Sequence, residues 1–191
     1  MVQIRELGFG AVLEVSPAKF GDNRGFFSET YNRKLFNSAG LDVEFVQDNH
    51  SYSAGAGTLR GLHFQVPPAA QGKLVRVTCG EIFDVAVDIR NGSPTFGQWV
   101  GVKISAADWN QIFIPPGFAH GFVTLAPDTE VVYKVTDYYS PEHDRTIRYD
   151  DQAIGIDWPS FGTPFELSQK DSNAPLLAEV DTVFIYSGES Q

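Results

Sequence analysis

The feature that most constrains the fold of this chain is a series of short segments with strand-like alternation. In residues 81–90, EIFDVAVDIR, every second side chain from Phe83 to Ile89 is apolar, and the residues between them are small or charged. A period of two is typical of a β-strand, whose successive side chains point to opposite faces. Similar segments, each bounded by turn residues, lie at 73–79, 96–105, 111–114, 120–125 and 130–136. Their spacing of about 8–12 residues predicts an antiparallel sandwich or barrel rather than a parallel sheet with crossover helices.

Predicted helices are short and lie at the periphery. Residues 32–40 combine Asn32, a favourable N-cap, with a terminating Gly40. A second helical region is expected at about 167–180. The sequence has no internal repeat and no linker-like stretch, so we expect the whole chain, 1–191, to form a single domain.

Charge and cysteine content exclude several classes of protein. The formal net charge of −10 argues against a broad nucleic-acid surface, and an anionic ligand would need a local cluster of Arg and Lys. Cys79 is the only cysteine, which rules out an intrachain disulfide and a cysteine-based zinc site. No apolar run reaches the roughly 20 residues of a membrane span, and the start is unlike a signal peptide. We expect a cytoplasmic protein that binds no nucleic acid and no membrane.

One motif points to a specific barrel. IPPGFAHGF contains P-x-G-x-x-H at Pro115, Gly117 and His120. It resembles the second motif of the cupins, which are double-stranded β-helix (jelly-roll) barrels. Metal-binding cupins place two histidines and a glutamate on an earlier strand. The corresponding segment here, GLHFQ, carries only His63, so we predict no metal site.

Six motifs in order resemble one family within that fold. They are RGLHFQ, QGKLVRV, GxxFDVAVDIRxGSPTFGxW, IPPGFAHGF, YKVTDYYSPEHDR and LSQKD, within a match from about residue 21 to 175. Together they resemble the dTDP-4-dehydrorhamnose 3,5-epimerases, metal-free cupins of nucleotide-sugar synthesis. The resemblance implies an all-β, cupin-type barrel with short peripheral helices. It also implies a dTDP-4-keto-6-deoxy sugar as substrate, in dTDP-rhamnose synthesis, with no cofactor.

The resemblance also implies a catalytic base. Such an enzyme removes a proton beside the 4-keto group, at C5 and at C3, and returns it on the opposite face. His63 matches the base, since an imidazole accepts a proton near neutral pH. Asp171 matches the carboxylate that orients it. Ser168 and Asp171 also fit a helix capping box, so the local sequence alone leaves both roles of Asp171 open.

Two further catalytic groups are implied on neighbouring strands. Lys73 would stabilise the enolate oxygen, and it shares a strand face with the apolar Val75 and Val77. Tyr133 would be the acid on the far side of the sugar, on the face of Val131 and Val135. The alternatives are a strand-end lysine that reaches solvent and a tyrosine that only packs in the core.

Substrate recognition is expected from cations, amides and an aromatic ring. Arg60 would contact the diphosphate, but it lies three residues from His63, so in a regular strand the two face opposite sides. Either a bulge at Gly61 or a substrate that bridges the two environments would resolve this. The remaining expected contacts are Gln47 and Asn49 to sugar or phosphate, His120 as a second donor, Tyr138 stacked on thymine, and Lys170 near the diphosphate. Asp144 falls where the family has an acidic substrate contact, usually Glu.

Residues 21–30, GDNRGFFSET, resemble a segment that family members contribute from a neighbouring subunit. Arg24 and Glu29 would complete the nucleotide site, with Phe20 or Phe27 beside the base. We therefore expect a homodimer with the N-terminal arm, about 1–40, at its interface. The same residues also read as a simple turn before a strand.

Other functions remain open on the sequence alone. A relative that inverts only C3, or a ketoisomerase of deoxysugar synthesis, would share the histidine, the aspartate and often the tyrosine. A metal-dependent cupin oxygenase or isomerase is a further alternative. A binding cupin without activity would not need the four catalytic groups.

Overall fold

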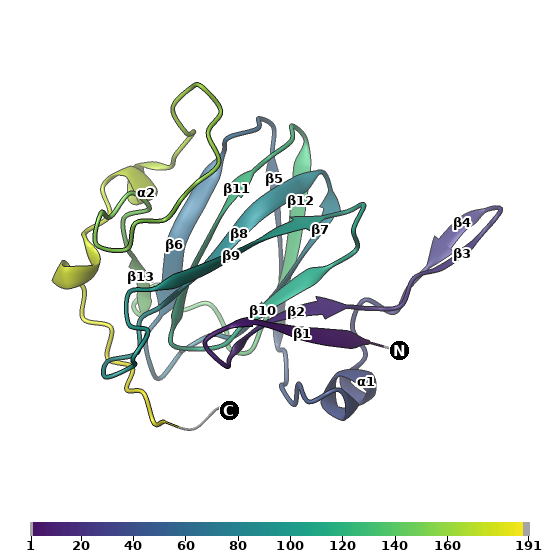
Figure 1. Cartoon of the computed structure of the whole chain (residues 1–191), viewed down its shortest axis with the longest axis horizontal. Helices are drawn as coiled ribbons and strands as arrows, with labels where there is room; N and C mark the ends of the chain where they lie inside the picture. Colours follow the sequence, from purple (N-terminus) through teal and green to yellow (C-terminus); the bar gives the residue numbers. More distant parts are fainter. Residues whose placement is uncertain (1, 189–191) are drawn as a thin grey trace.

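Two antiparallel sheets dominate the computed structural model, which describes residues 2–188 (Figure 1). The larger sheet runs in the order β1 (Gln3–Gly8), β2 (Val12–Ser16), β10 (Gln111–Ile114), β7 (Lys73–Cys79), β12 (Thr129–Val135) and β5 (Gln47–Ser53). The smaller sheet runs in the order β13 (Asp144–Thr146), β6 (Leu59–Gln65), β11 (Phe118–Thr124), β8 (Glu81–Asp88) and β9 (Trp99–Ser105). Each of the six segments with strand-like alternation overlaps one of these strands, and the all-β jelly-roll prediction is confirmed.

Much of the barrel interior is apolar because both sheets turn apolar side chains toward each other. Its buried cluster combines residues of the larger sheet, such as Val75 and Ile112, with residues of the smaller sheet, such as Ile82 and Phe122. The outer face of the smaller sheet is buried as well, since Val85 packs under the C-terminal segments with Ile154 and Leu177. Both faces of β8 are therefore covered, which leaves Asp84 and Asp88 buried rather than exposed to solvent.

The first helix, α1 (Arg33–Ser38), forms as predicted. The side chain of Asn32 accepts hydrogen bonds from the backbone N–H groups of Lys34 and Leu35, and the chain turns away at Gly40, whose φ is 96°. Phe36 anchors the helix on the outer face of the larger sheet, in a cluster with Leu74 and Phe113.

The C-terminal helical region is shorter than predicted. In place of a helix over 167–180, one turn, α2 (Gln169–Ser172), is followed by a 3₁₀ turn, η1 (Leu177–Glu179). Pro175 separates the two, because proline lacks a backbone N–H and the residue before it disfavours the helical conformation.

The expected bulge in β6 is present. His63 pairs with His120 and Arg60 pairs with Phe122, so a three-residue step on β6 faces a two-residue step on β11. Gly61 lies at this point with a φ of 143°, and a Cβ atom there would lie 2.5 Å from the Cα of Gly121. Directly opposed residues of paired strands point to the same face of the sheet. Arg60 and His63 therefore both point toward the barrel interior, as do their partners Phe122 and His120.

A separate hairpin, β3 (Phe20–Asp22) and β4 (Gly25–Phe27), projects away from the barrel (Figure 1). It pairs with neither of the larger sheets. Within residues 2–188, no helix is long and apolar enough to cross a membrane.

Candidate active site

A polar cavity of about 240 Å³ opens beside the apolar cluster, and Tyr133 contacts both. Strands β5, β6, β7 and β12 form much of its wall, with the segments around 139–144 and 170 at its rim. Its lining is Gln47, Asn49, His63, Phe64, Gln65, Gln71, Lys73, Tyr133, Tyr139, Asp144 and Lys170. Seven of the fifteen residues that the sequence analysis selected line this cavity: Gln47, Asn49, His63, Lys73, Tyr133, Asp144 and Lys170.

His63 and Asp171 form a hydrogen-bonded pair. The imidazole Nε2 lies 2.6 Å from Asp171 Oδ1, and the carboxylate is 3% exposed. Burial opposes ionisation of Asp171, but hydrogen bonds from His63 and Ser168 outweigh it and hold its pKa below the usual value. Burial lowers the pKa of His63, and the Asp171 carboxylate only partly offsets this. With Nε2 donating to an ionised carboxylate, the neutral ring presents Nδ1 as its basic nitrogen.

The two readings of Ser168 and Asp171 prove compatible. The backbone N–H of Asp171 donates to Ser168 Oγ over 3.1 Å, which is the cap of α2. Ser168 Oγ lies 2.8 Å from Asp171 Oδ2, while Oδ1 faces His63. One carboxylate therefore contacts both the cap of the helix turn and the imidazole.

Lys73 contributes a buried cation beside the base. Its side chain is 8% exposed overall, and Nζ donates to the backbone carbonyl of His63 over 3.2 Å. Burial lowers the pKa of Lys73 to about 8, while the negative charges of Asp144 and Asp84 resist the loss of its proton. Its ammonium thus stands at the cavity as a charge that water does not fully screen.

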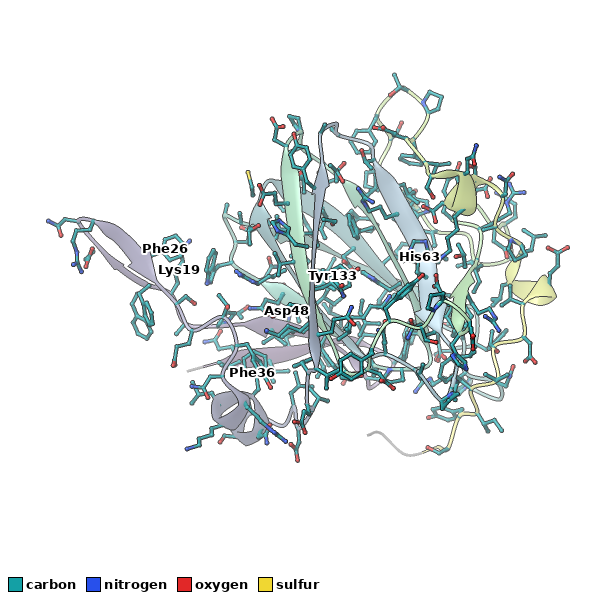
Figure 2. The ribbon with its side chains drawn as sticks, turned by 180° about the vertical axis from the view of Figure 1, so that it is seen from behind. Lys19, Phe26, Phe36, Asp48, His63 and Tyr133 are labelled. Carbon is teal, nitrogen blue, oxygen red and sulfur yellow. The ribbon has the colours of Figure 1, made fainter. Side chains whose placement is uncertain are left out.

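Tyr133 belongs to the sheet that faces His63. It sits on β12, between Asn49 of β5 and Val75 of β7, whereas His63 lies on β6 (Figure 2). Burial raises the pKa of Tyr133, and the nearby positive charge of Arg60 only partly opposes the rise. The phenol therefore keeps its proton at neutral pH, and it enters the cavity from the other wall.

A second carboxylate–imidazole pair, which the sequence analysis missed, lies deeper in the barrel. His120 Nε2 is 2.9 Å and 3.0 Å from the two oxygens of Asp84, which is fully buried. Burial raises the pKa of Asp84, and His120 and Lys73 counteract this by favouring the anion. On the sequence, Asp84 alternates with apolar residues and resembles a solvent-facing strand residue, so no local signal revealed it.

The expected nucleotide contacts are only partly at the cavity. Gln47 and Asn49 line it and share a hydrogen bond of 2.9 Å, and Lys170 pairs with Asp144 at its rim. Arg60 lies beside the lining, where its guanidinium donates to the Tyr52 carbonyl over 3.0 Å.

Of the two adjacent tyrosines, Tyr139 rather than Tyr138 lines the cavity. Its hydroxyl donates to Asp144 Oδ2 over 3.3 Å, and its backbone N–H donates to Gln47 Oε1 over 3.1 Å. Tyr138 is 64% exposed and lies outside the lining. The two tyrosines follow the end of β12, where alternation no longer indicates which of them turns inward.

The N-terminal residues do not reach this cavity within one chain. The hairpin that carries Phe20, Arg24 and Phe27 projects away from His63; Figure 2 shows Phe26 near the left end of the view and His63 to the right of Tyr133. Arg24 pairs with Asp22 at the hairpin tip, with 2.6 Å between Nη2 and Oδ2. Glu29 accepts a hydrogen bond from Asn32 over 3.2 Å at the hairpin's base.

The donor set suits proton transfer better than metal binding. Among residues 2–188, no group of three or more His, Cys, Asp or Glu side chains is close enough to hold a metal ion. Each imidazole of the barrel is committed to a single carboxylate. A neutral base on one wall, a protonated phenol on the other and a cation between them can exchange protons with both faces of a small ring.

Comparisons with known proteins find a family model and relatives that match most of this chain. A family model described as dTDP-4-dehydrorhamnose 3,5-epimerase matches residues 6–179. A protein of that name from Salmonella typhimurium is 59% identical over 167 residues, which cover 87% of this chain and 90% of the relative. Another from Sinorhizobium fredii is 53% identical over 182 residues, 95% of this chain and 93% of the relative.

Solved structures agree with the sequence comparison. A dTDP-6-deoxy-D-glucose-3,5-epimerase from Legionella pneumophila, crystallised in complex with dTDP-4-keto-L-rhamnose, superposes with a TM-score of 0.91. It is 46% identical in sequence, and the alignment covers 98% of this chain and all of that one (100%).

Proposed function

The chain belongs to the dTDP-4-dehydrorhamnose 3,5-epimerase family, and we infer that it inverts C3 and C5 of dTDP-4-keto-6-deoxy-D-glucose to give dTDP-4-keto-L-rhamnose. The protein is thus an isomerase of nucleotide sugars that acts in dTDP-L-rhamnose synthesis. The observation that carries the inference is the placement of a neutral imidazole and a protonated phenol on separate sheets around one cavity.

The first half of each inversion is proton removal. C3 and C5 both flank the 4-keto group, so loss of either proton gives an enolate whose charge rests on the 4-oxygen. His63 Nδ1 takes the proton as the C–H bond breaks, and Asp171 stabilises the resulting imidazolium through Nε2. The Lys73 ammonium stabilises the enolate oxygen, where its partly desolvated charge acts strongly.

The second half is proton return from the other wall. Tyr133 delivers its hydroxyl proton to the carbon on the face opposite His63, which inverts the centre. The phenolate and the imidazolium then exchange protons with solvent, so the balance needs no oxidant, reductant or cofactor. After the first inversion the ring must be re-presented, so that the second carbon lies between the same two groups.

His120 and Asp84 support the oxygen site. We assign His120 as a hydrogen-bond partner of the substrate near the 4-oxygen, and Asp84 as the residue that positions it. The 2.9 Å and 3.0 Å contacts from His120 Nε2 to Asp84 hold the imidazole in one orientation, and the buried anion also favours the charged form of Lys73.

Nucleotide binding is assigned to the rim and to a second subunit. Gln47, Asn49 and Lys170 line the cavity, and Arg60 beside it suits a diphosphate. We propose a homodimer in which the arm of one chain, about 1–40, brings Phe20, Arg24, Phe27 and Glu29 to the cavity of the other. The hairpin's projection away from its own cavity supports this arrangement. We also propose that the enzyme works in the cytoplasm, as suits nucleotide-sugar synthesis.

The deciding experiment couples the purified protein to a 4-ketoreductase that consumes only the doubly inverted product. Cofactor oxidation with wild type, and a loss of about 10²–10⁴-fold with His63→Ala, is the expected result. Proton NMR in deuterium oxide should show label at both C3 and C5. Label at C3 alone would favour a single-centre epimerase, and full dependence on an added metal would favour a cupin oxygenase or isomerase.

A further inference from the structure

The projecting hairpin β3–β4 is clamped at its root by one residue of the barrel, Trp109. The ring of Phe26 meets the indole edge to face, with 4.6 Å between centroids and 74° between planes. Lys19 Nζ lies 4.2 Å from the Phe26 centroid and 4.5 Å from the Trp109 ring. The three side chains form one stacked unit, which we call the root clamp.

Trp109 also links the residues that lie just before β3 and just after β4. Its Nε1–H donates to Ser28 Oγ over 2.9 Å, and Ser28 Oγ donates to the Ala18 carbonyl over 2.8 Å. Ala18 precedes β3 and Ser28 follows β4. The indole therefore fixes the chain where it leaves the barrel and where it returns.

Trp109 stands on a rigid part of the barrel. It lies in the turn between β9 and β10 with a φ of 62°, a conformation that non-glycine residues seldom adopt, and its N–H donates to the Ser105 carbonyl over 3.1 Å. The neighbouring Asn110 is buried and bonds to Glu14 and to the backbone of Lys103 and Ser105. The surrounding contacts thus hold the indole in place.

Beyond the root clamp, few contacts fix the direction in which the hairpin points. Its strands have three residues each and pair only with one another, and an isolated two-stranded hairpin is marginal in water. Its cross-strand pair, Phe20 and Phe27, is 61% and 67% exposed. An arm of this kind would sample many directions if the root were free, and each docking event would then lose that freedom.

We infer that Trp109 is a positioning residue for the active site of a second copy of this chain. By clamping Phe26 and Ser28, it aims Phe20, Phe27 and Arg24 at the partner's nucleotide-binding rim before substrate arrives. The inference rests on the proposed homodimer. Because the arm would contact the nucleotide and not the reacting carbons, loss of the clamp should raise KM and leave kcat nearly unchanged.

Mixed dimers with two different tags test this in trans. One subunit carries His63→Ala and an intact arm; the other carries Arg24→Ala and an intact base. Such a dimer has one complete site, with its base from the second subunit and its arm from the first. Adding Trp109→Ala to the arm-donating subunit should raise KM about tenfold, with kcat within twofold. The same change in the base-donating subunit should leave both constants unchanged.

Further variants distinguish an effect on the positioning of the arm from an effect on the stability of the whole protein. Trp109→Phe keeps an aromatic ring for Phe26 and Lys19 and should retain most of the wild-type KM. Phe96→Ala removes an aromatic side chain, 42% exposed, outside the hairpin and the site, and should change neither constant. Equal effects of Trp109→Ala in either subunit, or a fall in kcat alone, would overturn the inference.

Hydrogen exchange tests the clamp without relying on the dimer. Amides of residues 19–28 should exchange faster in Trp109→Ala than in wild type, while those of β7 and β12 stay protected. Unchanged exchange there refutes the clamp even if the mixed dimers are active. If mixed dimers recover no activity although wild type is a full epimerase, the arm does not act in trans, and the inference fails while the proposed reaction stands.

Discussion

His63 Nε2 and Asp171 Oδ1 lie 2.6 Å apart, although 108 residues separate them in the chain. The pairing joins a barrel strand to a single helical turn, and it commits the imidazole to one tautomer. It leaves the second ring nitrogen for the substrate.

Replacing Asp171 should impair proton abstraction more than substrate binding. Asp171→Asn keeps the size of the side chain but can stabilise the wrong tautomer and not the imidazolium, so we expect kcat to fall by about 10²–10⁴-fold with KM within a few fold. Steady-state rates in the reductase-coupled assay measure this. Ser168→Ala, which removes the cap but leaves the carboxylate, is the matched control and should lose less than tenfold.

The pH profile of kcat/KM should be bell-shaped and reflect two groups in the free enzyme. His63 must be neutral to accept a proton, and burial holds its pKa below 6.5, so activity should rise with pH through that lower range. Lys73 must be charged, and its pKa is about 8, so activity should fall as pH passes that value. In Lys73→Arg, any residual activity should lack the alkaline limb, because a guanidinium stays protonated. An alkaline limb that does not move would exclude Lys73 as its source.

Tyr133→Phe should separate proton exchange from inversion. His63 can still remove and return a proton on its own face, so proton NMR should show continued deuterium uptake beside the ketone. Doubly inverted product should fall by at least about 10²-fold, because no acid remains on the far wall. A variant that inverts at the wild-type rate would assign the acid to another group.

The adjacent tyrosines should differ in their effect on nucleotide affinity. Stacking of a base on an aromatic ring is worth about 1–3 kcal/mol, so Tyr139→Ala should weaken dTDP binding by about 5–150-fold. Tyr138→Ala should change it by less than twofold, since that ring lies outside the cavity lining. Calorimetric titration with dTDP compares the two. A larger loss with Tyr138→Ala than with Tyr139→Ala would support Tyr138 as the residue that stacks on thymine, as assigned from the sequence.

Gly61 should tolerate no side chain. A methyl group there meets the Gly121 backbone at 2.5 Å, so Gly61→Ala should lower the free energy of unfolding by about 2–4 kcal/mol, or the melting temperature by about 5–10 °C. Gly162 also has a positive φ, 71°, but a Cβ atom there would meet nothing within 4 Å. Gly162→Ala should therefore lose only about 1–2 kcal/mol. Equal losses in the two variants would mean that the close approach at Gly61 is unimportant.

Local patterns in the sequence predicted the strands well, because alternation is a property of neighbouring residues. The bulge followed instead from the roles that the family resemblance implied for Arg60 and His63. The patterns predicted the C-terminal helix too long, since the break at Pro175 outweighed the helix-forming residues around it. They gave no indication of the bond between Asp84 and His120, which depends on how two strands pair. They also could not choose between Tyr138 and Tyr139 beyond the end of a strand.

The carboxylate that steers the base is also part of the first turn of α2, a helix of only four residues. So short a helix has little stability of its own, and fraying begins in segments of this kind. Warming should therefore abolish activity at temperatures at which circular dichroism still shows a folded barrel, and cooling should restore the activity. The temperature at which activity is lost should therefore lie below the melting temperature of the barrel, because activity depends on one turn of helix.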